Sequence, residues 1–555
     1  MLTGATPSGD PVTLSIFQAA LVGMPLAFVG SVLLLGLYRR RVAGLMAGDG
    51  AAGPTPAAQR QRTLLFAASS SPALSAPQQV LAHALGAPRR AALVQLLAGG
   101  VTGCFVTIVN VSHARIEIFA LGFCLLALTY AWPAILTAGL SAARGLRGPL
   151  LGALSFVGLL ESLALLTFLR GHGEAVVFGT VITAWAWNCV VPTLFAGALV
   201  SRRVRAVGPV VFGCVAPLFF GLGLGFSLIT RFPKIVFICS GLLGGGSLWI
   251  WLLPVASALL VGPPLTAVWL FVLRTAYARK WLSDDTLTTD AIWLIALVTD
   301  FIFLLDSVSI TAAVLAGFLV YKLTSVLFRR LLVRAGEPRG RAPRLLYLRA
   351  FSGSSSSERS FRAIAKAWRY VGNVVMISGP DFATFMVEPH EILDFVSGRL
   401  ARRFIGDPSE LGTRRDLIDE GRDPDGRFRI SELFCRGNAW RAVFHHLLAN
   451  VDVVLADVRG LSATTPGIRF EVEQLGSHVE RTRVLLLTDA KTDTRLLHAH
   501  FGGQLPALEL SGRPARDTPH VLEALVHAAF GRRAGIPAPK AHQWAQPAPA
   551  ARLAP

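Results

Sequence analysis

The sequence predicts a polytopic α-helical membrane domain followed by a cytosolic α/β domain with a parallel sheet, and three observations support this fold class. The 555 residues are 53% hydrophobic with a mean hydropathy of +0.53, and only 16% are charged, whereas soluble domains average about a quarter charged. Apolar runs long enough to cross a bilayer recur over residues 13–328. Over residues 343–531, short apolar runs alternate with amphipathic segments, which is typical of an α/β domain.

About eight to ten membrane spans are expected. The first apolar run, Val12–Leu37, follows a short outer tail (1–12) without the basic region of a cleaved signal peptide, so we interpret the run as a retained anchor. Arginines 39–41 come directly after it, which indicates that residues 39–90 form a cytosolic loop. Further spans are expected near 91–111, 116–140, 149–169, 175–199 and 207–230.

Two later segments each allow two interpretations. Residues 235–273 fit either two crossings or one long crossing with a re-entrant piece broken at Gly262-Pro263-Pro264. Residues 291–328 fit either a helical hairpin or a single long helix. A basic juxtamembrane linker over 329–342 favours a cytosolic C-terminal domain, because cytosolic loops are enriched in Arg and Lys. The arginines from Arg329 to Arg344 are also expected to contact anionic lipid headgroups.

Polar residues are rare within the apolar runs. Glu161, Asp300 and Asp306 are candidates for a proton or ion path, and hydrogen bonding between helices or a position at a helix end is the alternative explanation. The spacings Gly221–Gly225 and Gly241–Gly245 predict close helix packing, because two small residues four apart let helix backbones approach.

Composition also bounds location and partners. The formal net charge is +19, carried mostly by arginine, and the abundance of Arg, Ala, Gly and Pro suggests a bacterial source. We therefore expect the bacterial cytoplasmic (inner) membrane. No basic stripe is interleaved with aromatic residues, so nucleic acid is not an expected partner. The six cysteines form no CxxC motif and no Cys/His cluster with metal spacing, so no metal site is expected and they are interpreted as small buried side chains.

The C-terminal α/β domain is predicted over residues 343–531, with a disordered Pro/Ala-rich tail at 532–555. The run 452–458 is apolar on both faces, which favours a central strand of a parallel sheet. The serines 354–357 are interpreted as part of a flexible loop. Strands are expected at 344–351, 373–379, 428–434, 452–458 and 483–489. Helices are expected at 361–372, 382–404, 438–451, 468–480 and 518–530, with a long loop over 405–427.

Candidate functional residues gather where the strands end, because ligands of open parallel sheets bind at the carboxyl ends of the strands. Glu471 opens a helix after the loop that follows strand 452–458, and a carboxylate there could stabilise or attack an oxocarbenium-like sugar centre. Asp457 could hold ribose hydroxyls, and Arg349 or Arg469 could bind a phosphate. The structural alternatives are a favourable charge at a helix start for Glu471 and a turn at the strand end for Asp457.

The segments "LLYLRAFSG", "AWRAVFHHLLANVDVVLADV" and "FEVEQL" resemble the Toll/interleukin-receptor (TIR)-like domains of bacterial membrane proteins and, more distantly, nucleoside 2-deoxyribosyltransferases. The resemblance covers roughly the last third of the chain and implies a flavodoxin-like fold. It implies that Glu471 takes the position of the glutamate that acts on an N-glycosidic bond. It also implies that Phe351 and Ser352 belong to the loop after the first strand, that NAD or a related nucleotide is the substrate or ligand, and that no further cofactor is required.

Three functions follow from these expectations. The first is a membrane receptor or signalling protein whose TIR-like domain binds, and in the enzymatic case cleaves, a nucleotide such as NAD. The second is a non-enzymatic module that forms homo-oligomers on a membrane bundle. The third is a transporter with a regulatory cytosolic domain, which the absence of an obvious internal repeat disfavours. The surroundings of Glu471 distinguish the first two, because an open site favours nucleotide chemistry and a buried salt bridge favours assembly.

Overall fold

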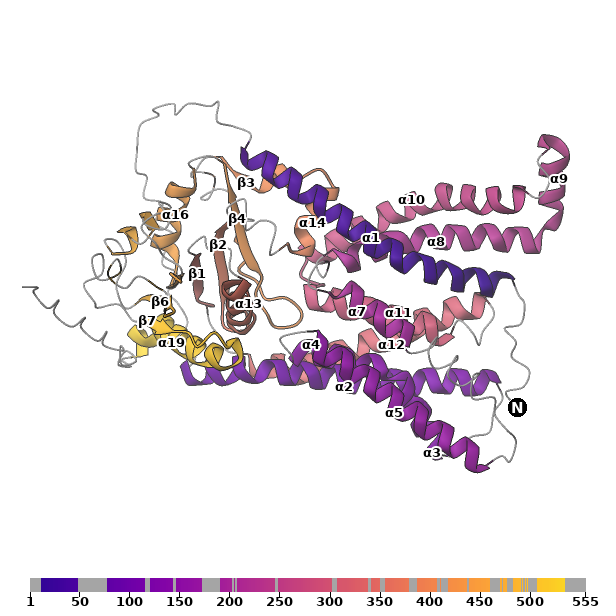
Figure 1. Ribbon diagram of the computed structural model, residues 1–555, viewed down its shortest axis with the longest axis horizontal. Helices are drawn as coiled ribbons and strands as arrows, with labels where there is room; N and C mark the ends of the chain where they lie inside the picture. Colours follow the sequence, from indigo (N-terminus) through magenta and orange to yellow (C-terminus); the bar gives the residue numbers. More distant parts are fainter. Residues whose placement is uncertain are drawn as a thin grey trace, which may run out of the picture. The chain divides into compact units, whose positions relative to one another are not determined.

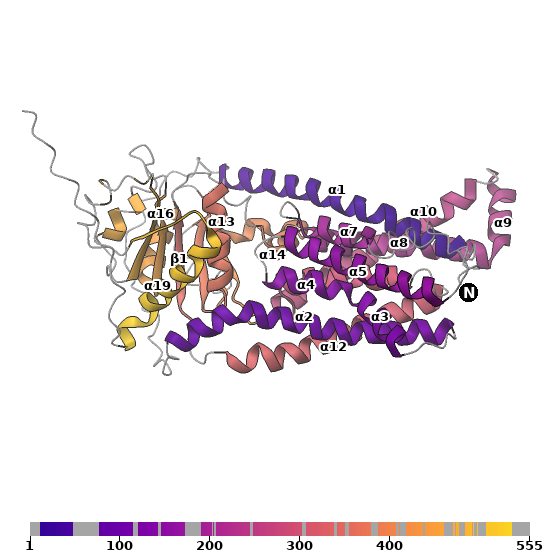
Figure 2. The ribbon, with the colours of Figure 1, turned by 60° about the horizontal axis from the view of Figure 1, so that its bottom comes forward.

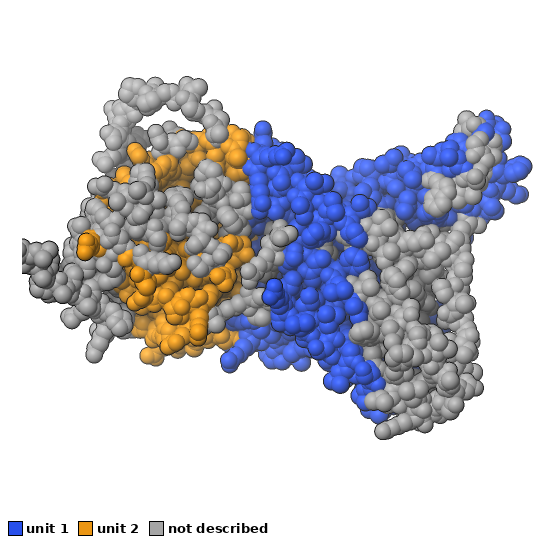
Figure 3. All heavy atoms as spheres, in the orientation of Figure 1, with its two compact units in different colours: residues 1–41, 88–335, 384–400 blue, residues 42–87, 336–383, 401–555 orange. Residues whose placement is uncertain are grey.

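A computed structural model of the chain contains a set of long helices and one seven-stranded sheet (Figure 1). The chain divides into two compact units, shown in Figure 3. The helical unit comprises residues 1–41, 88–335 and 384–400, and the sheet unit comprises residues 42–87, 336–383 and 401–555. The structure describes residues 11–47, 77–114, 120–142, 146–171, 190–201, 204, 207–244, 248–301, 307–337, 341–349, 355–378, 387–406, 410, 418–436, 439–459, 470–471, 473–476, 483–490, 492, 495, 497 and 507–534.

Apolar helices of 9 to 38 residues make up most of the helical unit. They are α1 (Pro11–Ala47), α2 (Pro77–Ala114), α3 (Ala120–Tyr130), α4 (Trp132–Ala142), α5 (Arg147–Gly171), α7 (Val191–Leu199), α8 (Gly208–Arg231), α9 (Pro233–Leu243), α10 (Trp249–Ala278), α11 (Asp284–Phe301) and α12 (Ser307–Leu332). Within the described residues, four helices are long and apolar enough to cross a membrane, or five if the bent pair α3 and α4 forms one span. This number is smaller than the eight to ten spans expected from the sequence, and part of the expected span 175–199 lies outside the described residues.

The two ambiguous segments each contain two helices. Residues 235–273 form most of α9 and α10, and α10 runs through Gly262-Pro263-Pro264 without a break, so the expected break at these residues is wrong. Neighbouring helices can compensate for the backbone hydrogen bonds that proline removes from a membrane helix. Residues 291–328 belong to α11 and α12, which pack against each other. The hairpin interpretation therefore holds for the second segment, with residues 302–306 outside the described part.

Helices α8 and α10 pack closely because glycines line their contact. A Cβ atom added at Gly221 would lie 2.8 Å from the Cα of Ala258, and one added at Gly225 would lie 2.5 Å from the Cα of Pro254. Real Cβ atoms do not come that close, so only glycine permits this backbone approach. The predicted packing role of the first glycine pair is confirmed. Of the second pair, Gly241 has open space around it within the described structure, and Gly245 lies outside.

Helix α12 has one exposed leucine face and one packed face. The exposed leucines recur every four residues, at Leu315, Leu319, Leu323, Leu327 and Leu331. The opposite side buries Val314 and Tyr321, and the ring of Tyr321 stacks on Trp293 of α11 at 4.9 Å. Water-soluble surfaces rarely expose such a continuous apolar face, whereas a lipid bilayer accepts it. The exposed leucines therefore fit the membrane insertion that length and composition indicate.

Helix α14 (Pro389–Val396) clusters with the helical unit, although the sequence predicted a helix over 382–404 within the α/β domain. The hydroxyl of Tyr38, on α1, donates a hydrogen bond to Glu391 Oε2 at 2.9 Å. The same ring meets Phe395 edge-on, with the ring centroids 5.7 Å apart. Glu391 is 1% exposed, so Tyr38 of α1 contacts a buried carboxyl group of α14.

The sheet unit is built on seven strands in the order β3-β4-β2-β1-β5-β6-β7, and every neighbouring pair is parallel. The strands are β1 (Arg344–Arg349), β2 (Asn373–Ser378), β3 (Phe404–Ile405), β4 (Ile430–Cys435), β5 (Val453–Asp457), β6 (Val484–Thr488) and β7 (Ala507–Glu509). Strand β5 lies between β1 and β6, and all its residues are buried. The prediction of a parallel sheet with 452–458 near its centre is therefore confirmed.

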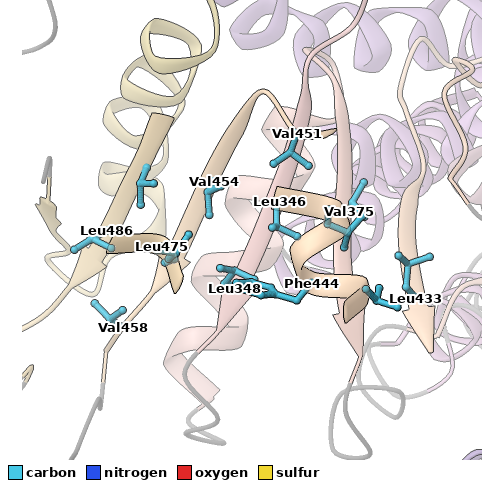
Figure 4. Packing of buried hydrophobic residues seen from close by; sticks show 14 of the residues in the cluster. Leu346, Leu348, Val375, Leu433, Phe444, Val451, Val454, Val458, Leu475 and Leu486 are labelled. Atoms are coloured by element: carbon cyan, nitrogen blue, oxygen red, sulfur yellow. The ribbon is translucent and has the colours of Figure 1, made fainter. Parts of the chain in front are cut away.

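Helices cover both faces of this sheet. Helix α16 (Ala439–Asn450) packs its Phe444 on one face, in a core that includes Leu346, Val375 and Val454 (Figure 4). Helices α13 (Ser355–Trp368) and α19 (Pro514–Ala534) contact each other and are drawn side by side in Figure 2. Successive side chains of a strand point to opposite faces. Residues of β1 and β5 that alternate with Leu346 and Val454 therefore face α13.

The boundaries differ from the prediction mainly where tertiary contacts decide them. Helix α13 begins at Ser355, so the interpretation of serines 354–357 as a flexible loop is wrong for its described residues. Serine favours helix starts because its hydroxyl can replace missing backbone partners. Strands β3 and β7 were not predicted, because two or three residues carry too little periodicity.

Candidate active site

The carboxyl ends of β1 and β5 bring two of the predicted residues together. Arg349 and Asp457 are register partners on these adjacent parallel strands, and both lie on the face covered by α13. Asp457 is 1% exposed and accepts hydrogen bonds from three side chains. Its Oδ2 accepts a hydrogen bond from the hydroxyl of Ser357 at 2.5 Å and one from the hydroxyl of Tyr347 at 3.2 Å. The guanidinium of Arg459 donates hydrogen bonds to both carboxylate oxygens, to Oδ2 at 2.6 Å and to Oδ1 at 2.8 Å.

Arg459 completes this buried polar network. It is 6% exposed, and beyond Asp457 it donates to the hydroxyls of Ser357 at 3.1 Å and Ser360 at 3.3 Å. Burial alone would lower the pKa of Arg459, but the hydrogen bonds and the charge of Asp457 outweigh burial, so its pKa lies above the ordinary value. Burial, together with the charge of Asp457, raises the pKa of Tyr347 well above its usual range, so Tyr347 stays a neutral donor. The network is thus a charge-balanced link between β1, β5 and α13.

The residue before Glu471 fixes the start of the following helix on the opposite face of the sheet. The ring of Phe470 lies 5.4 Å from the Trp440 ring and 5.8 Å from the His445 ring, both edge-on. The guanidinium of Arg441 lies 5.3 Å from the centre of the Phe470 ring, within the range of a cation–π contact. These partners all belong to α16, so Phe470 anchors the residue next to Glu471 against that helix.

Glu471 itself is half-buried and lacks a neutralising partner within the described residues. Desolvation raises the pKa of its carboxyl to about 8. A carboxyl group with that pKa is mostly protonated at neutral pH, and a positive charge placed beside it would favour the ionised form. Perturbed carboxyl groups at the ligand edge of a sheet are candidates for catalysis, because a general base works best near the operating pH.

The predicted site residues thus separate into three groups. Arg349 and Asp457 lie together on the α13 face. Glu471 follows Phe470, which packs against α16 on the other face. Asp457, expected to hold ribose hydroxyls, and Glu471, expected to be catalytic, are therefore associated with opposite faces of the sheet. The remaining three, Phe351, Ser352 and Arg469, lie outside the described residues.

Sequence reasoning missed the partners of Asp457. Ser357 and Ser360 lie about a hundred residues before it, and no local pattern connects them. The available signal was Arg459, two residues after Asp457 at the end of an apolar strand, since a buried acid usually needs a nearby cation. In comparisons with known proteins, no family model, no curated protein and no solved structure matches this chain.

Proposed function

We propose that this protein is a membrane-anchored signalling enzyme whose sheet unit binds a nucleotide such as NAD and cleaves its N-glycosidic bond through Glu471. The observation that carries the proposal is the desolvated carboxyl of Glu471, which stands at a helix start after β5 without a neutralising partner among the described residues. Burial disfavours the charged form of such a carboxyl, and a perturbed acid at the ligand edge of a sheet is a candidate functional group. The cytosolic placement of the sheet unit follows from the arginines around residues 329–344.

The strand order supports a nucleotide as the ligand. Strands β2-β1-β5-β6-β7, taken without β3 and β4, have the order 2-1-3-4-5 of flavodoxin-like folds. In such sheets the chain turns from one side of the first strand to the other, and ligands bind at the carboxyl ends of the strands beside that point. Here that point lies between β1 and β5, where Arg349 and Asp457 end their strands.

The proposed role of Glu471 is to stabilise positive charge on the sugar during the reaction. In NAD the bond between the ribose C1′ and the pyridinium nitrogen breaks, and its electron pair neutralises the leaving base. The sugar carbon becomes oxocarbenium-like until water adds and loses a proton. A carboxylate beside that carbon stabilises the positive charge. Because a cation nearby favours the ionised carboxyl, a pyridinium nucleotide would itself promote the form of Glu471 that the reaction needs.

The test is base release by the full chain in detergent micelles supplied with NAD. Glu471→Gln should lower base release by about a hundredfold or more, because it removes the charge and keeps the shape. For the wild type, kcat/KM should rise with pH, reach half of its plateau near pH 8 and level off above it, since the carboxylate is the active form and the pKa of the free carboxyl is about 8.

Glu473→Gln is the matched control, because it makes the same change two residues away on another side of the helix. This variant should release base at nearly the wild-type rate. Wild-type protein that binds NAD but releases no base would contradict the enzymatic proposal. Equal losses in the Glu471 and Glu473 variants would show that the helix, and not one carboxyl, matters.

A non-enzymatic assembly module is the second candidate, and the state of Asp457 favours it. Both oxygens of that carboxylate are occupied by Arg459, and Ser357 and Tyr347 add further bonds, so Asp457 offers little to ribose hydroxyls. A domain that only assembles needs such rigid internal links and no catalytic acid. Light scattering of the full chain with and without NAD would distinguish the two, since assembly alone predicts a nucleotide-independent oligomer.

A further inference from the structure

A basic and aromatic cluster lies next to Glu471 at the ligand edge of the sheet. Helix α16 follows strand β4 directly, so its start stands where the carboxyl ends of the strands lie. The second and third residues of α16 are Trp440 and Arg441. The ring of Trp440 meets the ring of Phe470 edge-on at 5.4 Å, and Glu471 is the next residue of the chain. The first turn of α16 therefore contacts the immediate neighbour of the proposed catalytic acid.

The guanidinium of Arg441 contacts two aromatic rings of this cluster. Its central carbon lies 5.5 Å from the centre of the Trp440 ring and 5.3 Å from the centre of the Phe470 ring. A cation within about 6 Å of a ring centre is attracted to the face of the ring. Two such contacts restrict where the charge can lie, so less conformational entropy is lost when a ligand binds to it.

The charge of Arg441 is not neutralised by any carboxylate within the described residues. Desolvation alone raises the pKa of Glu471, so the two side chains do not form an ion pair. The cation–π contacts are electrostatic, and they leave N–H donors of the guanidinium available. Arg441 is also exposed, so a ligand in solution can reach it. A planar guanidinium with available donors binds phosphate with two parallel hydrogen bonds.

The start of α16 adds a second attraction for anions. This helix has 12 residues and no acidic residue in its first turn. The first backbone N–H groups of a helix have no partner within the helix, and the helix dipole places partial positive charge there. Phosphate groups bind at such helix starts for both reasons. The guanidinium of Arg441 and the start of its helix therefore favour the same kind of ligand.

A nucleotide connects this cluster to Glu471 through its ribose. The glycosidic carbon C1′ and the 5′-phosphate lie at opposite ends of the sugar. Glu471 is the group proposed to act at C1′, and Arg441 contacts the residue before it. Because the two side chains do not pair with each other, a ligand that binds both has its sugar between them.

We propose that Arg441 binds the 5′-phosphate of the nucleotide whose glycosidic carbon lies at Glu471. The substrate class is then the phosphorylated nucleotides, and free nucleosides are poor ligands. Trp440 and Phe470 are positioning residues, because they hold the guanidinium and do not react. This inference rests on the proposed function and deepens it by naming the group that the site recognises.

Two ligands that differ by one phosphate test the proposal, namely nicotinamide mononucleotide and nicotinamide riboside. Equilibrium dialysis of the full chain in detergent micelles measures their affinities, and the chain carries Glu471→Gln so that base release does not consume them. The mononucleotide should bind about tenfold to a hundredfold more tightly than the riboside, because only the mononucleotide forms hydrogen bonds between charged groups at Arg441.

Variants of Arg441 assign the difference to one side chain. Arg441→Gln should weaken binding of the mononucleotide and leave binding of the riboside unchanged. Arg441→Lys should keep part of the preference, because the charge remains and the planar pair of donors is lost. Arg359→Gln is the matched control, since it makes the same change at an exposed arginine of α13 on the other face of the sheet. This control should keep the full preference for the mononucleotide.

Three binding results would overturn the proposal. One is equal affinity for the two ligands before Arg441 is changed. A second is an equal loss for both ligands in Arg441→Gln, which would mean that the arginine only holds Phe470 in place. A third is displacement of the mononucleotide by inorganic phosphate at the concentration at which unlabelled mononucleotide displaces it, which would mean that Arg441 binds free anions.

Base release by the chain with Glu471 intact separates failure of this proposal from failure of the reaction. Binding of the mononucleotide that depends on Arg441, without base release, would support the phosphate site and contradict the reaction. Base release from both ligands at equal kcat/KM, unchanged in Arg441→Gln, would support the reaction and overturn the phosphate site.

Discussion

Asp457 and Glu471 are two acids near the same edge of one sheet, and their surroundings are opposite. Asp457 is 1% exposed yet fully paired, with a guanidinium and two hydroxyls on its oxygens. Glu471 is more exposed but has no partner within the described residues, and desolvation raises its pKa to about 8. Burial alone therefore does not mark a functional acid. Pairing turns a buried acid into a structural link, and the lack of a partner leaves an acid available for chemistry.

Breaking the paired acid should have the largest effect. Asp457→Asn leaves the buried guanidinium of Arg459 without its counter-charge, and losing one member of a buried pair costs about 3–5 kcal/mol. The loss should appear as a lower urea midpoint in pulse proteolysis of the sheet unit within the full chain. Asp452→Asn, at a more exposed ion pair near the start of β5, should cost only about 1 kcal/mol. Equal losses would contradict the structural role of the Asp457 network.

Glu471, the acid without a partner among the described residues, should make the stability of the sheet unit depend on pH. The folded pKa of Glu471 is about 8 and lies above the ordinary unfolded value, so the folded state holds the proton more tightly. Stability should therefore be highest below about pH 4.5 for this group, fall as pH rises and level off above about pH 8. The slope should be at most about 1.4 kcal/mol per pH unit.

Glu471→Gln isolates that contribution, because glutamine is neutral at every pH. The variant should match the wild type at low pH and be more stable than the wild type near pH 9, as measured by the thermal midpoint of the sheet unit in the full chain. A variant that is less stable than the wild type at high pH would show that the Glu471 carboxylate has a partner, and the contrast with Asp457 would fail.

A third acid, Glu391 of α14, tests whether pairing works the same way in the helical unit. Tyr38→Phe removes the hydroxyl that donates to Glu391 and leaves the ring against Phe395. The backbone N–H of Glu388 still donates to the same oxygen, and losing one buried hydrogen bond to a charged group costs about 1–3 kcal/mol. Thermal denaturation in micelles should show this loss, and Tyr38→Phe combined with Glu391→Gln should recover part of it. No recovery in the double variant would mean that Tyr38 stabilises α14 through its ring alone.

The sequence predicted features that depend on local periodicity, and it missed those that depend on distant contacts. The parallel sheet and the position of strand 452–458 followed from a run that is apolar on both faces, because burial on both faces leaves little choice. The packing of Gly221 and Gly225 followed from their spacing. The early start of α13 at Ser355 did not, and the contact that its first turn makes, from Ser357 to Asp457 a hundred positions later, leaves no local pattern.

The same limit applies to the candidate site. Position after β5 was enough to single out Glu471, but its raised pKa comes from burial in the folded chain, which no local pattern specifies. For Asp457 the strand end was evident, and its pairing with Arg459 decided its role. The clustering of residues 384–400 with the helical unit could not be predicted, because the helix there is amphipathic like those of the α/β domain.

The smallest expected effects come from the two serines that bond to the Asp457–Arg459 pair. The sizes of their stability losses should rank Ser357 above Ser360. Ser357 bridges both charges, donating to Asp457 at 2.5 Å and accepting from Arg459 at 3.1 Å, whereas Ser360 only accepts one long bond from Arg459 at 3.3 Å. A hydrogen bond to a charged group contributes about 1.5–3 kcal/mol, and a weak one contributes less. Ser357→Ala should therefore lower stability by about 1.5–3 kcal/mol in pulse proteolysis, and Ser360→Ala by about 0.5 kcal/mol. Combining Ser357→Ala with Asp457→Asn should cost less than the sum of the single changes, because both act on the hydrogen bond between Ser357 and residue 457. Additive losses would mean that Ser357 stabilises α13 independently of Asp457, and the network would then be two separate contacts.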